Sequence, residues 1–194
     1  MKKWLVAILL LCAIPDSVLA EGGAVSAADP RAAEAGREIL RQGGSAADAA
    51  IAMMLALSVV EPQSSGIGGG GFMIHNDGRT NDIGTIDGRE TAPSSASPRL
   101  FLDAAGKPMP FIDAFAGGRS VGVPGNIALA ARASARWGKL RWPALFQPAI
   151  RLAENGYQVT PRLAEALSRL KAIWPDFPAA QAIYWQDGRP KQVG

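Results

Sequence analysis

One arginine and a run of glycines upstream of it are the residues best suited to chemistry in this chain. Arg89 carries a planar guanidinium, which can bind a carboxylate through two parallel hydrogen bonds that lysine cannot reproduce. The four glycines from Gly68 to Gly71 lack side chains, so the backbone there can pass close to other groups and adopt positive φ. The pattern predicts a carboxylate-binding arginine beside a glycine-lined cleft. A structural salt bridge from Arg89 to Asp87 or Glu90 is the alternative interpretation.

A β-hairpin is the element expected to position Arg89. Residues 72–76 and 81–89 are two stretches suited to strands, and they flank Asn76-Asp77-Gly78, which is a turn signal. Arg89 then lies at the end of the hairpin that is far from the turn.

The glycine run does not fit a nucleotide-binding motif. A P-loop needs Gly-Lys-Ser/Thr after its glycines, and Phe72-Met73 stands there instead. A dinucleotide-binding fold needs glycines that follow a strand and open a helix, whereas these precede a strand.

Other side chains that often carry catalysis are poorly placed for it. His75 is the only histidine and has no cysteine near it, so a strand or turn role is favoured over metal binding or general-base catalysis. Ser64-Ser65-Gly66 lacks the Gly-x-Ser-x-Gly pattern of a nucleophile elbow. We therefore predict no catalytic residue and no metal site within this chain.

Several ordered motifs together resemble the γ-glutamyltransferase (glutathione hydrolase) family, and the resemblance covers nearly all of the chain after residue 25. The segments that carry it are 39–50 (Ile-Leu-Arg-Gln-Gly-Gly-Ser-Ala-Ala-Asp-Ala-Ala), 61–67 (Glu-Pro-Gln-Ser-Ser-Gly-Ile), 68–73, 86–93 (Ile-Asp-Gly-Arg-Glu-Thr-Ala-Pro), 121–125 (Val-Gly-Val-Pro-Gly) and 147–156.

The resemblance implies a role for Arg89 and a fold. In the family, the arginine of the Arg-Glu-x-Ala-Pro motif binds the α-carboxylate of a γ-glutamyl substrate, and Arg89 to Pro93 match that motif residue by residue. The implied fold is α+β, as part of the four-layer αββα sandwich of N-terminal-nucleophile hydrolases, incomplete without a C-terminal part. Residues 21–194 would be the N-terminal part of the large subunit, and the missing small subunit would be the partner.

The resemblance also implies a threonine nucleophile that lies outside this chain. Family members are made as longer precursors that cut themselves, and the new N-terminal threonine of the small subunit attacks the γ-glutamyl amide. The four threonines present lie in no such processing motif: Thr80, Thr85, Thr91 and Thr160. We therefore expect this chain alone to be inactive. Glutathione and other γ-glutamyl compounds are the implied substrates, with no cofactor.

Two alternatives to this function stay open. Many family members carry an aromatic residue before the arginine, where this chain has Gly88, which would either open space beside the carboxylate clamp or be a neutral turn residue. Extra space would favour a related cephalosporin or glutaryl acylase. The other alternative is an inactive truncated remnant or a γ-glutamyl-binding module.

The N-terminus has the pattern of a secretory signal peptide over residues 1–20. Lys2 and Lys3 precede an apolar run, and Val18-Leu19-Ala20 supplies small or apolar residues at the cleavage positions. The run is about half of the roughly 20 residues that span a bilayer, so a membrane anchor is the weaker interpretation. We expect a periplasmic or secreted protein without membrane attachment after cleavage.

Composition limits the partners of the mature chain. The only cysteine, Cys12, lies inside the signal-like run, so neither a disulfide nor a cysteine-ligated metal is expected. Loss of Lys2, Lys3 and Asp16 with that run leaves 18 basic and 16 acidic side chains, a net charge of +2. This balance predicts no nucleic-acid partner.

The remaining elements are predicted mainly from helix starts and stops. Asp29-Pro30 opens a helix to about residue 40, and a Ser45/Asp48 capping box opens a buried helix over 46–60. Residues 91–125 are expected to form a long ordered loop with a short helix around 99–104. Helices are expected over 126–137, over 142–155 with a kink at Pro148, and from Pro161 to about 173. A strand over 182–185 and a turn at 186–188 complete the prediction.

Overall fold

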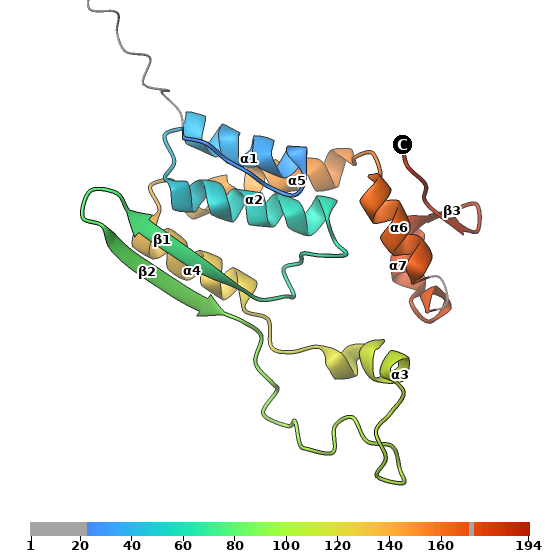
Figure 1. The fold of residues 1–194 in the computed structure, drawn as a ribbon. Coiled ribbons are helices and arrows are strands. Elements are labelled where there is room, and N and C mark those ends of the chain that lie inside the picture. The colour runs from blue at the N-terminus through green and yellow to red at the C-terminus, as the bar shows by residue number, and fades with distance from the viewer. Residues whose placement is uncertain (1–22, 171–172) are drawn as a thin grey trace, which may run out of the picture.

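The computed structural model describes residues 23–170 and 173–194 (Figure 1). The predicted signal peptide at residues 1–20 lies outside the described residues. The described part combines helices with two small antiparallel sheets, so the predicted α+β class is confirmed.

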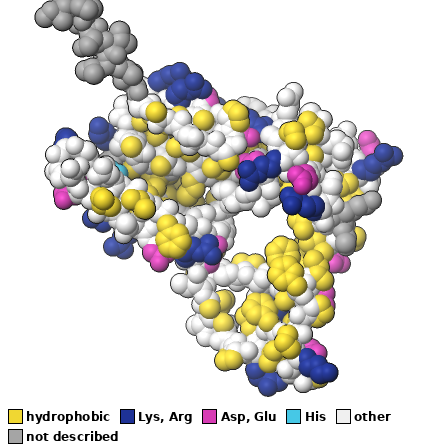
Figure 2. Space-filling view, viewed as in Figure 1, with side chains coloured by type: hydrophobic (Ala, Val, Ile, Leu, Met, Phe, Trp, Pro, Cys, Tyr) yellow, Lys and Arg dark blue, Asp and Glu magenta, His cyan; other side chains and the backbone are white. Residues whose placement is uncertain are grey.

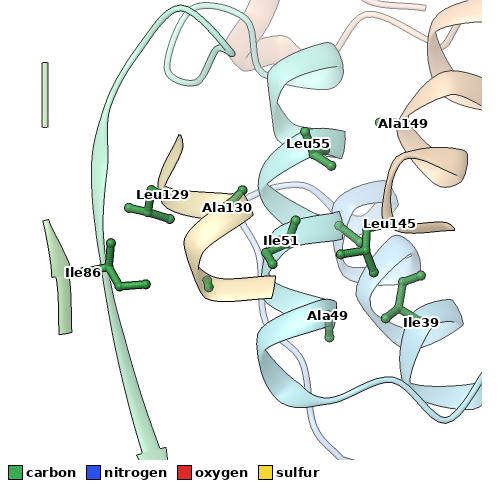
Figure 3. Packing of buried hydrophobic residues seen from close by; sticks show 11 residues of the cluster. Ile39, Ala49, Ile51, Leu55, Ile86, Leu129, Ala130, Leu145 and Ala149 are labelled. Atoms are coloured by element: carbon green, nitrogen blue, oxygen red, sulfur yellow. The ribbon is translucent and has the colours of Figure 1, made fainter. Parts of the chain in front are cut away.

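The core is built around one buried helix. Helix α2 (Ala46–Val60) packs against α1 (Pro30–Arg41), α4 (Asn126–Trp137) and α5 (Gln147–Asn155). In Figure 3, Ile51 and Leu55 of α2 lie between Leu129 and Ala130 on one side and Leu145 and Ala149 on the other. This confirms that 46–60 is a central core helix.

Local capping explains why these helices begin where they do. The side chain of Asp29 accepts the N–H of Arg31 at the start of α1. At α2, Ser45 Oγ accepts the N–H of Asp48 at 3.1 Å, and Asp48 Oδ2 accepts the N–H of Ser45 at 2.9 Å. The predicted capping box is therefore present, and it satisfies two backbone donors at the start of the helix.

The predicted hairpin is also confirmed, although Asn76 and Asp77 belong to its first strand and its turn lies at residues 78–81. Strand β1 (Gly71–Asp77) pairs antiparallel with β2 (Asp82–Gly88), from Gly71 opposite Gly88 to Asp77 opposite Asp82. Helix α4 covers one face, where Met73 and Ile86 join the core. Phe72, Ile74 and Ile83 alternate with them on the other face and are 69%, 75% and 71% exposed. Within the described chain, the hairpin therefore presents an uncovered apolar face.

The segment between β2 and α4 extends away from the helical core and differs from the prediction. The expected helix around 99–104 is a series of turns, because Asp103 Oδ1 accepts the N–H groups of Ala105 and Lys107 and bends the chain back. The short helix of this segment is α3 (Phe111–Phe115), which begins after Pro110, and a 3₁₀ turn, η1 (Gly118–Ser120), follows. Figure 2 shows hydrophobic side chains gathered over α3 and the loop before it; Phe111 is 78% exposed.

The predicted kink at Pro148 is wrong. Residues 142–155 form a 3₁₀ turn, η2 (Trp142–Phe146), followed by α5, and Pro148 lies in the first turn of α5. A proline there removes a backbone N–H that has no partner within the helix, so it starts the helix without bending it.

The C-terminal part holds the remaining corrections. Helix α6 (Pro161–Arg169) ends earlier than predicted, and η3 (Trp174–Asp176) and α7 (Pro178–Tyr184) follow. The strand predicted over 182–185 is wrong for its first three residues, because the helix that Pro178 opens continues through Tyr184. Strands β3 (Trp185–Gln186) and β4 (Arg189–Pro190) form a small hairpin. Its turn confirms the one predicted at 186–188, with positive φ at Asp187 and Gly188.

Candidate substrate-binding site

The glycine run forms a turn that is fixed by the start of α4. The carbonyl oxygen of Gly69 accepts the backbone N–H groups of both Gly125 and Asn126, each at 3.0 Å. The Asn126 side chain donates from Nδ2 to the carbonyl oxygen of Gly66 at 2.7 Å. Asn126 is buried, so these bonds hold the turn in a site with little competition from water.

Close approach, and not a left-handed backbone, explains the glycine at position 70. A Cβ atom there would lie 2.5 Å from the carbonyl oxygen of Gly88 and 2.6 Å from both the backbone N and Oε2 of Glu90. None of the four glycines of the run has positive φ, so that part of the prediction is wrong. The glycine turn is therefore pressed against the end of β2, directly beside Arg89.

Arg89 follows the last residue of β2 and is held at its backbone. Its N–H donates to Asp87 Oδ1 at 2.9 Å. Its Nη1 lies 2.9 Å from Glu90 Oε2, and the Arg89 side chain is 56% exposed. The Glu90 Oε2 atom is buried and has no aligned hydrogen-bond donor among the described residues. The predicted alternative of an ion pair is thus present with Glu90, and this pair orients a guanidinium that still reaches solvent.

Arg89 and Glu90 both line two clefts. The first, the glycine cleft, has a volume of about 730 Å³, and its lining includes Gly69, Gly70, Gly71 and Asn126. The second, which we call the arginine cleft, has a volume of about 330 Å³ and is lined by Arg89, Glu90, Thr91, Ala92, Pro93, Leu100, Phe101, Arg119, Ser120, Val121 and Gly122. The structure therefore confirms that Arg89 borders a glycine-lined cleft.

The sequence prediction missed Asn126 and Arg119 as residues of these clefts. Asn126 was expected only as the first residue of a helix, and Arg119 lies inside the segment expected to be a loop. The motif at 121–125 (Val-Gly-Val-Pro-Gly) is the sequence feature that could have pointed to these residues, because Val123 pairs with Thr91 just after β2.

The other candidate side chains have structural surroundings. His75 stacks on Trp137, with ring centroids 4.5 Å apart and planes 8° apart. Ser64 Oγ accepts a hydrogen bond from Arg162 at 3.2 Å, and Thr160 caps α6 by accepting the N–H of Leu163. Within 23–170 and 173–194, no group of three or more His, Cys, Asp or Glu side chains is arranged to hold a metal ion. No helix in that same part is both long and apolar enough to cross a bilayer.

Comparison with known proteins decides the family. The family model described as "Gamma-glutamyltranspeptidase" matches residues 32–194. The chain belongs to the γ-glutamyltranspeptidase family. It is 43% identical over 172 residues to the glutathione hydrolase proenzyme of Bacillus subtilis, an alignment that covers 89% of this chain and 29% of that protein.

Solved structures of γ-glutamyltranspeptidases share the fold. The Helicobacter pylori γ-glutamyltranspeptidase matches with a TM-score of 0.83 and 34% identity over 89% of this chain and 49% of that one. The cephalosporin acylase of Bacillus halodurans matches with a TM-score of 0.67 and 31% identity over 84% of this chain and 31% of that one. The chain thus has part of the α+β fold of N-terminal-nucleophile hydrolases. It spans about three-tenths of the length of the curated γ-glutamyltranspeptidase relatives it matches.

Gly88 does not open the space that the sequence suggested beside Arg89. A Cβ atom at Gly88 would lie 2.6 Å from Cβ of Leu129 and 3.2 Å from the carbonyl oxygen of Gly125. Gly88 is also the last residue of β2, paired with Gly71, and not a turn residue. Both interpretations of this position are corrected: the glycine allows the end of β2 to pack tightly on α4.

Proposed function

We propose that this chain supplies the carboxylate-binding part of an enzyme that cleaves γ-glutamyl amides such as glutathione. The observation that carries the proposal is Arg89, whose solvent-accessible guanidinium is paired with Glu90 and whose backbone is held at the end of β2 by Asp87. A γ-glutamyl compound presents a free α-carboxylate away from its scissile amide. A guanidinium of fixed orientation binds that group through two hydrogen bonds.

We further propose that the nucleophile is a threonine outside this chain. The chain covers 29% of a relative named a proenzyme, and its own threonines lie in a turn, in strand β2, in a bridge to Val123 and at a helix cap. The threonine hydroxyl would attack the γ-carbonyl, with the α-amine of the same residue as base, and the acyl group would pass to water or an amino acid. "The complete protein" below means this chain together with that C-terminal part, formed as a small subunit.

The uncovered face of the hairpin supports a missing neighbour. Phe72, Ile74 and Ile83 are all more than two-thirds exposed on one face of a two-stranded sheet. Apolar side chains gathered in this way normally mark an interface. We propose that strands of the small subunit cover them, and that export through residues 1–20 places the protein in the periplasm or outside the cell.

The experiment for the proposed function is replacement of Arg89 by lysine in the complete protein. Lysine keeps the positive charge but loses the two-bond geometry, so Arg89→Lys should raise KM for γ-glutamyl-p-nitroanilide. Arg89 is 56% exposed; the expected loss is therefore that of an exposed ion pair, up to about 1 kcal/mol, or about fivefold in KM. Arg79→Lys, at the turn end of the same hairpin, is the matched control and should leave KM unchanged. Equal KM values for wild type and Arg89→Lys would refute the role of Arg89.

An acylase activity is the second candidate function, because the Bacillus halodurans cephalosporin acylase matches 84% of this chain. Glutaryl amides keep the carboxylate of a γ-glutamyl donor but lack its α-amino group, so Arg89 alone cannot tell the two apart. The tight packing at Gly88 removes the structural reason for a widened acyl site. Faster hydrolysis of glutaryl amides than of glutathione by the complete protein would replace the transferase assignment with an acylase.

A further inference from the structure

The arginine cleft forms because two distant segments meet. The N–H of Val123 donates to the carbonyl oxygen of Thr91 at 2.8 Å, and the two residues form an antiparallel bridge. This bridge brings the residues that follow Arg89 against the residues that follow Arg119. The two arginines therefore line the same space of about 330 Å³, although thirty positions separate them in the sequence.

Arg119 is held in place by neutral groups. Its Nη1 donates to the carbonyl oxygen of Leu100 at 2.9 Å and lies 3.4 Å from Sδ of Met109. In the part of the chain that the structure describes, Arg119 forms no ion pair within 4.0 Å, in contrast to Arg89 and its neighbour Glu90. The orientation of the guanidinium is thus partly fixed while its charge is not neutralised by a carboxylate.

Apolar side chains contribute much of the remaining lining of the cleft: Ala92, Pro93, Leu100, Phe101 and Val121. The charged groups that line it are Arg119, which has no paired carboxylate in the described chain, and Arg89, which is paired with Glu90. A ligand that could use both arginines has two carboxylates with little charge between them.

We propose that the arginine cleft binds the peptide portion of a γ-glutamyl peptide, with Arg119 as the residue that recognises its C-terminal carboxylate. The inference rests on the proposed function, because it takes Arg89 as the site of the α-carboxylate. Glutathione has carboxylates at opposite ends, with an uncharged cysteine residue in the middle. Arg119 is then a specificity residue that favours γ-glutamyl peptides over γ-glutamyl amides without a distal acid.

A neighbouring cleft supplies the matched control. Arg132 on α4 lines a space of about 350 Å³ that Arg89 also borders, so it is a second position from which an arginine could meet a distal carboxylate. A carboxylate lines each of the two spaces, but Glu90 in the arginine cleft is paired with Arg89, whereas Asp87 beside Arg132 forms no ion pair within 4.0 Å in the described chain. The unpaired negative charge of Asp87 disfavours a second carboxylate there. Arg119 and Arg132 are both exposed, so replacing either with glutamine removes one positive charge from the surface.

The test compares glutathione with glutathione esterified at its glycine carboxylate, in the complete protein and in Arg119→Gln and Arg132→Gln. In wild type, kcat/KM for glutathione should exceed that for the ester by about two- to fivefold, as expected for an exposed ion pair, and added salt should reduce the preference. Arg119→Gln should bring the ratio to about one, and Arg132→Gln should leave it unchanged. Arg119 also donates a hydrogen bond to the carbonyl oxygen of Leu100, so its loss could disturb the local structure. Such damage would lower kcat/KM for both donors together and leave their ratio unchanged.

The possible outcomes separate this inference from the proposed function. Three results for the ratio of kcat/KM between glutathione and its ester would overturn the role of Arg119 without touching γ-glutamyl hydrolysis itself. They are a ratio near one in wild type, a ratio that Arg119→Gln does not change, and a ratio that falls to one in Arg132→Gln. Absence of turnover with every donor would count against the proposed function. In that case, calorimetric titration of glutathione and its ester into the same proteins would test the Arg119 site. Wild type should bind glutathione more tightly than the ester, and Arg119→Gln should lose this preference.

Discussion

Gly70→Ala should damage both the stability of the protein and the position of Arg89. The added methyl group would lie 2.5 Å from the carbonyl oxygen of Gly88 and 2.6 Å from the backbone N and Oε2 of Glu90. Two of these three atoms belong to the backbone and cannot rotate away. Insertion of a methyl group into such a packed site typically costs about 1–3 kcal/mol. We expect a loss of unfolding free energy in that range.

Gly68→Ala is the matched control because it lies two residues away in the same turn. A Cβ atom at Gly68 meets nothing within 4 Å, and φ at this residue is not positive. Alanine is compatible with such a position, and it typically raises stability by about 0.4–1 kcal/mol by restricting the unfolded chain. The two substitutions add the same methyl group, so they differ only in what that group touches.

Urea denaturation of the complete protein measures the first effect, and KM for γ-glutamyl-p-nitroanilide measures the second. Gly70→Ala should lower the denaturation midpoint without a change in slope. It should also raise KM, because the methyl group pushes on Glu90, whose carboxylate lies 2.9 Å from the Arg89 guanidinium. Equal midpoints for Gly70→Ala and Gly68→Ala would refute the role assigned to close approach. A lower midpoint with unchanged KM would refute the link between the glycine turn and Arg89.

Three further predictions concern the scaffold. Asp48→Asn should lower the unfolding free energy of the complete protein by about 1.5–3 kcal/mol. The buried Asp48 Oδ2 accepts three backbone N–H groups, those of Ser45, Lys139 and Leu140, at 2.9, 2.8 and 3.2 Å. Asp113→Asn, at an exposed position, should change the unfolding free energy little in the same urea titration. The side-chain hydrogen bond from Arg31 lowers the pKa of Asp29 below its ordinary value of 3.8. The pair therefore stabilises the fold above pH 3.8, and this stabilisation is lost as the pH falls through the folded pKa. Asp29→Asn should make the fall of unfolding free energy at acid pH shallower, and an unchanged profile of stability against pH would contradict this. Residues 21–194 purified alone should be poorly soluble or partly molten, and one sharp, reversible thermal transition of a monomer would show that the exposed hairpin face needs no neighbour.

The elements that the sequence predicted well are those fixed by local signals. The helix from Ala46 to Val60 follows from a capping box and an unbroken apolar stretch, and both act within a few residues. The hairpin follows from a turn signal between two strand-forming stretches. Arg89 could be singled out because it ends that hairpin beside the glycines, and because the residues around it match a family motif.

The features that the sequence did not predict depend on residues far apart in the chain. The close contact between Gly88 and Leu129 arises only once α4 packs on β2, so the glycine was misinterpreted as extra space. Arg119 enters a cleft with Arg89 only through the bridge from Thr91 to Val123. The strand expected over 182–185 failed for a local reason, because the helical start at Pro178 outweighs the strand propensity of Ile183 and Tyr184.

The most direct test of the proposed division of labour compares the 194-residue chain with the complete protein in a γ-glutamyl-p-nitroanilide assay. In the proposed function, Arg89 binds a part of the substrate that does not react, and binding that is uniform in the ground and transition states does not accelerate the chemical step. We predict that the complete protein releases p-nitroaniline and that the chain alone releases none above buffer. Release by the chain alone that disappears in Arg89→Ala, in a preparation free of host enzyme, would contradict the assignment of the nucleophile to a threonine outside this chain.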